Sequence, residues 1–549
     1  MAIRALFRRL FSSEPVRRAL VASFIVMIFL GGVQLRRWTG EKTRHVRFQH
    51  DIVNGFYWGS ETLAEARKLS PDGSSDEPWP AFFRGYLALY DRVKDDAYEK
   101  DYGLDYPPLR LLAMSVWAKQ VRSEFPGVDD GHPKLVNPLL KMNLLCELIS
   151  AVAIFLLVRF WVRRSDRATR SPFLRGLPRR HRAFICGLAA ASVAWLEPSM
   201  ILDAHGWPQW DVWIVPFYLF AVLAALKNRW FLCGALLAAG AMFKGQLLFV
   251  APFFVLWPLW QKRWTRALRM LAGFIATAAL IVSPWLLRTP VAWIAVAAVA
   301  GLSSLFLLRR GLLHRSAWIA GVIGCAAFVI GAFTGGSFSW LQIGFVYGSE
   351  HYPYLFISSC YNLPVLLSNL GWSLKDTFWS ADFGSLHFAI TLQWMLRLLY
   401  LGALALCARG VAQHSRDHDP RLLIAIAMPW LLMFALLGQM HERYLMWGAV
   451  VSAVAFAVSV RLSVLHFIIS FASLTMIAHV MLIDKKLHST LGAIELLNVL
   501  RPYASGLVLA CVAACLWDTL AVRPTVFQSR RYRWLEPASL SLGTAAEEG

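Results

Sequence analysis

The sequence predicts an all-α integral membrane protein. Of its 549 residues 57% are hydrophobic and only 16% are charged, and the mean hydropathy is +0.49, outside the range of soluble globular chains. Apolar runs recur from Ala19 to Ala521, and a helix needs roughly 20 such residues to cross a hydrocarbon core. These runs lack the alternation of a membrane β-barrel, so helices are expected.

The basic residues are interpreted as topology signals. The formal net charge is +21, but Lys and Arg cluster in short connections between apolar runs. Cytoplasmic loops retain Lys and Arg, so this placement indicates how the chain is oriented in a membrane. It also indicates that the chain is surrounded by membrane lipids and does not bind nucleic acid. The basic N-terminus is then cytoplasmic, and because no small-residue cleavage site follows it, the run from Ala19 to Gln34 is expected to be a retained first span.

Alternating sides at each run gives about fourteen predicted spans, several of which, notably Trp230 to Met242, are too short for a straight crossing. They are 19–34, 139–160, 183–196, 212–226, 230–242, 247–260, 268–287, 291–308, 317–332, 388–407, 422–437, 444–460, 462–483 and 506–522. The predicted organisation is a cytoplasmic N-terminus with the first span (1–36), a large first external loop (37–138), a block of spans (139–332), a second long external loop (333–386), C-terminal spans (387–522) and a basic then acidic cytoplasmic tail (523–549).

Cysteine and asparagine usage points to a compartment. The eight cysteines form no disulfide framework and no CxxC metal pair, and seven of them lie within or beside apolar runs. No Asn is followed two places later by Ser or Thr, as a glycosylation acceptor would be. The sequence therefore favours a bacterial inner membrane over the endoplasmic reticulum membrane.

The predicted topology places most of the unusual ionisable residues on the external side, which suggests one shared site. Ionisable groups at membrane depth are costly and usually mark a cavity, a pathway or a partner. The alternative for any one of them is a charge that caps a span and reaches into the headgroups. The residues are Asp51, Glu61, Asp105, Asp203, His205, Asp211, Lys244, Glu350, His351, His441, Glu442 and Arg443.

Four stretches carry a family resemblance. Residues 103–109 (GLDYPPL) resemble the DYPPL element of dolichyl-phosphate-glucose glucosyltransferases, 203–211 (DAHGWPQWD) are similar to their DHGHFQYN element, and 243–246 (FKGQ) resemble the FKQM that follows it. Residues 440–445 (MHERYL) resemble the motif of the same letters in bacterial polyprenyl-phosphate-dependent glycosyltransferases. The second element departs from the family pattern, because Ala204 is inserted and Trp207 and Asp211 replace a His and an Asn.

This resemblance implies a GT-C type bundle of about 12–14 transmembrane helices, in which the first external loop carries interfacial helices and the catalytic carboxylate. It implies an inverting transfer of a hexose from a polyprenyl-phosphate sugar donor to a lipid-linked or other glycan acceptor at the non-cytoplasmic face. The position of Asp51 just after the first span matches the family's general base, with Glu61 as the competing assignment.

The remaining residues receive binding or supporting roles. His441, Arg443 and Lys244 are expected to bind the donor phosphate. Acceptor or supporting roles are assigned to Asp105, Asp203, His205, Gln209, Asp211 and Glu442. No HExxH or Cys/His pattern suggests a metal, so we expect neither a metal nor another cofactor.

Two other functions remain open at this level. A transporter or lipid flippase would be expected to show an internal repeat with broken helices in matching halves, and no convincing repeat is present. A non-catalytic membrane assembly subunit would explain the long external loops but not the clustered cations and carboxylates. An assay for sugar transfer separates the three.

Overall fold

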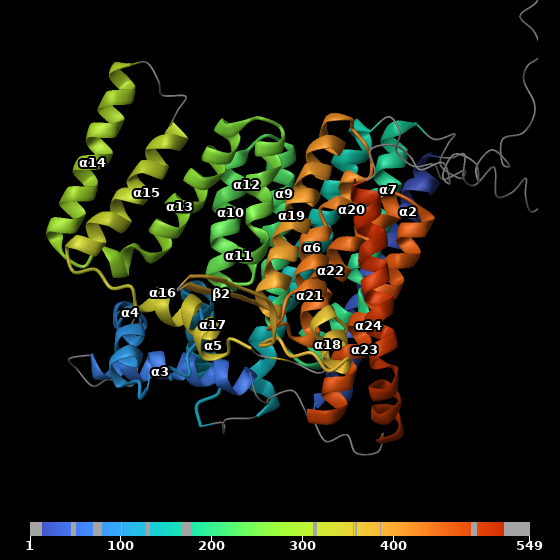
Figure 1. Cartoon of the computed structure of the whole chain (residues 1–549), viewed down its shortest axis with the longest axis horizontal. Coiled ribbons are helices and arrows are strands. Elements are labelled where there is room, and N and C mark those ends of the chain that lie inside the picture. Colours follow the sequence, from blue (N-terminus) through green and yellow to red (C-terminus); the bar gives the residue numbers. More distant parts are fainter. Residues whose placement is uncertain are drawn as a thin grey trace, which may run out of the picture.

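The structure is a computed structural model, and it describes residues 14–44, 51–69, 79–99, 101–127, 132–165, 178–310, 316–354, 356, 359–384, 386–484 and 491–520. Within these ranges the chain is almost entirely helical (Figure 1). The predicted cytoplasmic tail at 523–549 lies outside the described residues, as do residues 166–177 in the basic connection between the predicted spans 139–160 and 183–196.

The described residues contain nine helices that are long and apolar enough to cross a membrane, which confirms a multi-pass, all-α membrane protein. They comprise α2 (Glu14–Lys42), α6 (Asn137–Arg164), α7 (Arg179–Trp195), α13 (Trp264–Leu286), α14 (Pro290–Arg309), α15 (Ser316–Phe333), α19 (Leu392–Arg416), α23 (Val460–Asp484) and α24 (Leu491–Leu520). The span that contains α7 continues through α8 (Pro198–Ile201) into a π-helical turn, η4 (Leu202–Gly206).

The other predicted runs form shorter or broken helices inside the bundle. They are η5 with α9 (Asp211–Trp213 and Ile214–Leu226), α10 (Trp230–Phe243), α11 with α12 (Leu247–Val250 and Pro252–Trp260), α20 with α21 (Leu422–Ala425 and Met428–Leu436), and η8, α22 and η9 (Glu442–Tyr444, Leu445–Ser452 and Ala453–Ala457). Pro252 is the first residue of α12 and Pro429 is the second residue of α21, and both lie in the first turn, where a helix does not need the missing N–H. The breaks leave helix ends inside the protein, and several of these ends supply the site described below.

The predicted first external loop folds as three helices at one end of the bundle (Figure 1). They are α3 (Asp51–Lys68), α4 (Trp79–Asp96) and α5 (Pro108–Glu124), and η2 (Pro133–Val136) leads from them into α6. Ile52, Phe56 and Leu63 recur at helical spacing and bury one face of α3. The C-terminal end of α14, which carries basic residues, lies at the opposite end of the bundle (Figure 1).

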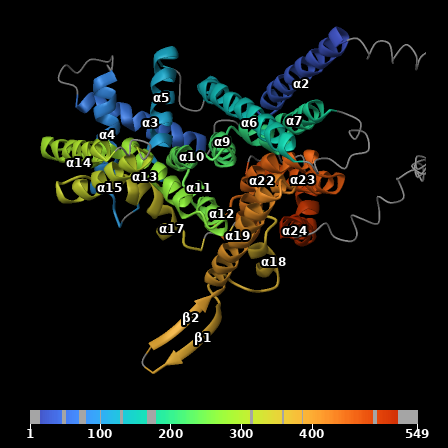
Figure 2. The same cartoon turned by 90° about the horizontal axis from the view of Figure 1, so that it is seen from above.

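The predicted second external loop contains short helices and the two strands found in the described residues. The helices are α16 (Ser339–Leu341), the π-helical turn η7 (Gln342–Val346), α17 (Tyr347–His351) and α18 (Leu363–Asn369). Strands β1 (Thr377–Phe383) and β2 (Leu386–Thr391) pair antiparallel and project from the bundle (Figure 2). The span expected from Phe388 therefore begins later, because Phe388 to Thr391 belong to β2 and α19 starts at Leu392.

Two glycines allow α10 and α13 to pack closely. A Cβ added at Gly234 of α10 would lie 1.8 Å from the carbonyl oxygen of Met270, and one at Gly273 of α13 would lie 2.0 Å from that of Phe231. Small residues at such crossings let two backbones approach, as is common between helices in membranes.

We expect Gly234→Ala to lower the thermal unfolding temperature of the detergent-purified protein, since the new methyl group forces α10 and α13 apart at a cost of about 1–3 kcal/mol. Gly301→Ala in α14 is the matched control, because a Cβ there meets no atom within 4 Å. The control should be neutral or stabilised by up to about 1 kcal/mol, from the better helix propensity of Ala. Equal unfolding temperatures for the two variants would contradict the close crossing.

Candidate functional site

Four chain regions meet at broken helix ends and bring acids and cations together. Asp51 is the first residue of α3, Asp211 begins η5, Lys244 follows the last turn of α10, and Arg443 lies in η8. Lys244 has an extended backbone, with φ −154° and ψ 117°, so the chain leaves the helix at this residue. The predicted convergence of early acids with late cations is therefore present in the structure.

Arg443 is the centre of this arrangement, which we call the Arg443 cluster (Asp51, Asp211, Lys244, Glu442 and Arg443). Its Nη2 donates to Asp51 Oδ2 at 2.8 Å, and its Nε donates to Asp211 Oδ2 at 2.8 Å. A longer contact of 3.4 Å joins Nη1 to Glu442 Oε1. Because only 8% of the Arg443 side chain is exposed, these charge-assisted bonds lie in a poorly solvated environment, where they hold the guanidinium in one orientation.

Lys244 forms the second cationic arm of the cluster. Its ammonium pairs with Asp211 Oδ1 and lies 4.8 Å from the ring centroid of Tyr444 and 5.4 Å from that of Trp447. The indole N–H of Trp447 donates to the backbone oxygen of Asp211 at 2.8 Å. Asp211 is thus fixed from three sides, and it bridges Lys244 to Arg443.

Asp51 is the accessible carboxylate of the cluster. Its side chain is 40% exposed, whereas that of Asp211 is fully buried and that of Glu442 is 3% exposed. Burial raises the pKa of Asp51, but the nearby cations, Arg443 first, outweigh it and hold the pKa below its ordinary value. Asp51 is therefore ionised at neutral pH, and its side chain is partly exposed at the surface.

Gln209 and His441 flank Asp51. In the orientation that satisfies both of its polar atoms, the Gln209 amide donates to Asp51 Oδ2 at 3.2 Å and accepts from the Trp207 indole at 3.2 Å. Burial lowers the pKa of His441 well below its ordinary value, and Arg443 and Lys244 lower it further against the opposing charge of Asp51. His441 is therefore a neutral imidazole at pH 7, able to donate one hydrogen bond but carrying no charge.

Of three further residues assigned to the site from the sequence, Glu61 and His205 pair with residues outside the Arg443 cluster, whereas the charge of Asp203 interacts with those of Arg443 and Lys244. Glu61 faces Arg92 of α4 at 2.7 Å. His205 contacts Glu147 of α6, with 2.9 Å between Nε2 and Oε2. Asp203 is fully buried, and its two carboxylate oxygens have no hydrogen-bond partner among the described residues.

The segment around Asp105 borders the site and is held by two tyrosines of α4. The hydroxyl groups of Tyr90 and Tyr86 donate to the backbone oxygens of Tyr106 at 2.5 Å and Pro108 at 2.7 Å. Asp105 itself is exposed. The two prolines that follow Tyr106 restrict the backbone, so the segment presents Asp105 in a set position.

Sequence reasoning missed several residues that shape the site. Asn143 of α6 donates to the backbone oxygens of Ala204 at 2.8 Å and Gln209 at 2.9 Å, and it accepts from the Trp213 indole at 2.6 Å. Arg110 lies over the rings of Tyr106 and Trp210, at 3.9 and 4.4 Å from their centroids. Two features of the sequence could have identified them. Asn143 is an amide side chain inside an apolar run, and Arg110 is a cation directly after the DYPPL element.

In the described part of the chain, no group of three or more His, Cys, Asp and Glu side chains is placed to hold a metal ion. The cluster is instead a set of carboxylates bound to nitrogen cations. Such a site can take up a proton at Asp51 and can offer N–H donors to an anionic group.

Comparison with known proteins gives one family match. Residues 105–301 match the model of glycosyltransferase family 87. This stretch contains Asp105, Asp203, Asp211 and Lys244, whereas Asp51 and the MHERYL motif lie outside it. No curated protein matched the chain. Over little more than a third of its length, the chain is similar to glycosyltransferase family 87, and this similarity indicates a glycosyltransferase.

Proposed function

We propose that the protein is an inverting, GT-C type glycosyltransferase that moves a hexose from a polyprenyl-phosphate donor to a lipid-linked or other glycan acceptor. The observation that carries this proposal is the contact between Asp51 and Arg443, which are 392 residues apart in sequence. It joins an accessible carboxylate to a buried cation, the two groups that a displacement at a sugar phosphate needs. The family match over 105–301 supports the sugar-transfer chemistry.

Asp51 is the proposed general base. Its carboxylate takes the proton of the acceptor hydroxyl while that oxygen forms a bond to the anomeric carbon. The bond from this carbon to the phosphate oxygen breaks on the opposite face, so the anomeric configuration inverts. Asp51 is favoured over Glu61 for this role because Glu61 is paired with Arg92. Glu61 also lies ten residues further along α3, away from the end at which Asp51 meets Arg443.

Arg443 is proposed to stabilise the departing lipid phosphate. Guanidinium has five N–H donors in a planar fork, and the contacts with Asp51, Asp211 and Glu442 use one from each nitrogen. The remaining donors suit phosphate oxygens as negative charge grows on them. His441, being neutral, adds a hydrogen bond without a charge, and Lys244 contributes its positive charge through its pair with Asp211.

Asp105, Asp203, His205 and Gln209 are proposed to shape the acceptor side, with Asp211 and Glu442 orienting the two cations. We propose that the reaction occurs at the non-cytoplasmic face. This is supported by the position of the α3–α5 end of the bundle, opposite the end at which α14 finishes with basic residues (Figure 1). The absence of Asn-x-Ser/Thr acceptors supports a bacterial inner membrane.

The direct test is a transfer assay with the full-length protein reconstituted in liposomes. Synthetic polyprenyl-phosphate donors carrying different labelled hexoses are supplied with lipid extracts as acceptors and EDTA in the buffer. We expect release of polyprenyl phosphate and a labelled product whose anomeric configuration, read by NMR, is the opposite of that in the donor. Lipid or sugar movement across the liposome without any bond cleavage would instead favour the transporter interpretation.

A further inference from the structure

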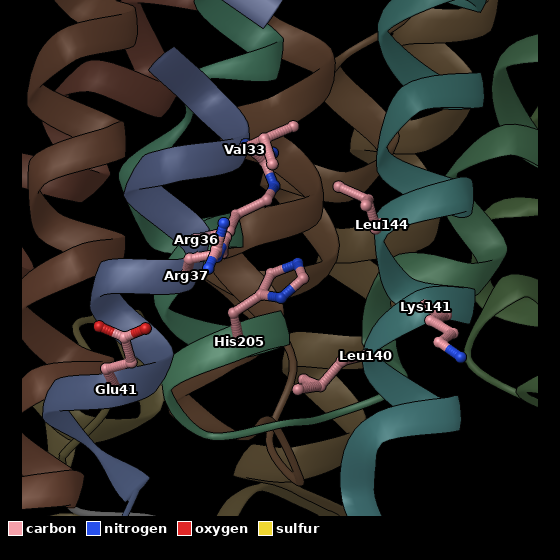
Figure 3. A pocket seen from close by; sticks show the side chains of 8 residues that line it. All are labelled: Val33, Arg36, Arg37, Glu41, Leu140, Lys141, Leu144 and His205. Carbon is pink, nitrogen blue, oxygen red and sulfur yellow. The ribbon is translucent and has the colours of Figure 1, made fainter. Parts of the chain in front are cut away.

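A cavity of about 280 Å³ lies between α2 and α6, next to the turn η4 and separate from the Arg443 cluster (Figure 3). Three cations line it: Arg36 and Arg37 from α2, and Lys141 from α6. His205 lies between the two helices in Figure 3. The volume is near the lower end of the range typical of small-molecule sites.

One wall of the cavity is held in place by a buried ion pair. Arg36 Nε donates to Glu147 Oε2 at 2.6 Å, and its other nitrogens donate to the backbone oxygens of Gly32 at 2.9 Å and Trp195 at 2.8 Å. The same Glu147 oxygen contacts His205. The Arg36 side chain is only 2% exposed, so this wall is rigid and its charge is balanced.

The other two cations are not balanced in this way. In the part of the chain that the structure describes, Arg37 and Lys141 take part in no ion pair and no hydrogen bond of their side chains, and both are exposed. Glu41 is the one acid in the lining. The cavity therefore has a net positive charge and free N–H donors, which suit an anion.

The lining changes from polar to apolar with depth. Helices α2 and α6 are both candidate membrane spans, and the cavity lies where α2 ends and α6 begins. Val33 is one turn further into the α2 span than Arg37, and Leu144 is almost one turn further into α6 than Lys141. Cations at the end of a span with aliphatic groups below them match a lipid phosphate and the start of its acyl chains.

We propose that this cavity binds the phosphate headgroup of an anionic membrane lipid. Ordinary interfacial Arg and Lys side chains reach outward to many headgroups, whereas here cations from two spans line one concave site with a fixed wall. The cavity shares no lining residue with the Arg443 cluster. His205 lines it and is also proposed to shape the acceptor side, so the lipid proposal rests on Arg37 and Lys141, which have no role in the proposed sugar transfer.

The test compares two charge-matched double variants of the full-length protein in a non-ionic detergent. Arg37→Gln/Lys141→Gln removes the free cations, and Lys262→Gln/Arg309→Gln removes two exposed cations from other helix ends. Dioctanoyl phosphatidylglycerol is the probe, dioctanoyl phosphatidylcholine and inorganic phosphate are the comparison ligands, and binding is followed by native mass spectrometry and thermal shift.

We expect phosphatidylglycerol to bind the wild type and the control alike, and to bind the Arg37/Lys141 variant roughly tenfold or more weakly. Arg37→Lys/Lys141→Arg keeps both charges and should retain binding, which separates loss of charge from misfolding. Equal binding by the two double variants would overturn the proposal. Saturation by inorganic phosphate with an equal thermal shift would also overturn it, because the site would then recognise a free anion and not a lipid.

Discussion

Asp51→Asn is expected to abolish sugar transfer while leaving the donor bound. The amide is nearly the same size and can still accept a hydrogen bond from Arg443, so the cluster should keep its geometry. It cannot take up the acceptor proton, and loss of a general base typically costs about 10²–10⁴ in rate. The turnover rate and the donor dissociation constant, measured separately in detergent, check both parts of the prediction.

Glu61→Gln is the matched control for Asp51→Asn. It makes the same chemical change on the same helix, at a carboxylate that contacts Arg92 and not the Arg443 cluster. We expect the control to retain transfer. If Asp51→Asn were active and Glu61→Gln inactive, Glu61 would be the general base. If both variants were active, the proposed mechanism would be wrong.

Arg443→Ala is expected to weaken donor binding, slow transfer and lower stability together. The substitution removes the counter-charge from Asp51, Asp211 and Glu442, and two of these carboxylates are almost fully buried. Breaking a buried pair by removing one partner typically costs about 3–5 kcal/mol, so the unfolding temperature should fall clearly. Donor affinity, transfer rate and thermal unfolding are the three readouts.

Arg443→Lys separates the catalytic part of this prediction from the structural part. It keeps the positive charge but loses the planar fork that contacts the carboxylates through three nitrogens. We expect it to fold with a smaller loss of stability and still to transfer sugar more slowly than the wild type. Wild-type transfer by a folded Arg443→Lys variant would show that the fork does not contact the departing phosphate.

The membrane helices were predictable because their signal is local. Apolar runs mark spans without any knowledge of their neighbours. Within the described residues, the predicted runs fall on helical segments, apart from Phe388 to Thr391 and short breaks such as 426–427 and 458–459. Phe388 to Thr391 are as apolar as the span that follows, but they pair with β1, for example Ala381 with Phe388. Strand pairing depends on a partner, so a hydropathy pattern could not separate β2 from α19.

The membership of the site was only partly predictable. Asp51, Asp211, Lys244 and Arg443 were all candidates, and the structure brings them into contact. Glu61 and His205 were equally good candidates by type and predicted side, yet Arg92 and Glu147 are their partners. The pairing of each acid with a cation depends on the rotation and crossing of the helices. These cannot be read from the composition of the sequence.

By itself, the sequence determined that this chain resides in a membrane, where its spans lie and which charges are unusual there. These properties follow from the free energy of transferring each segment from water to hydrocarbon, which depends on the residues of that segment alone. Only the tertiary structure decided that Arg443 joins Asp51 to Asp211, and that Arg36, Arg37 and Lys141 line one cavity away from that cluster. Electrostatic contacts act over a few ångströms, so they are set by packing between segments that are remote in the chain.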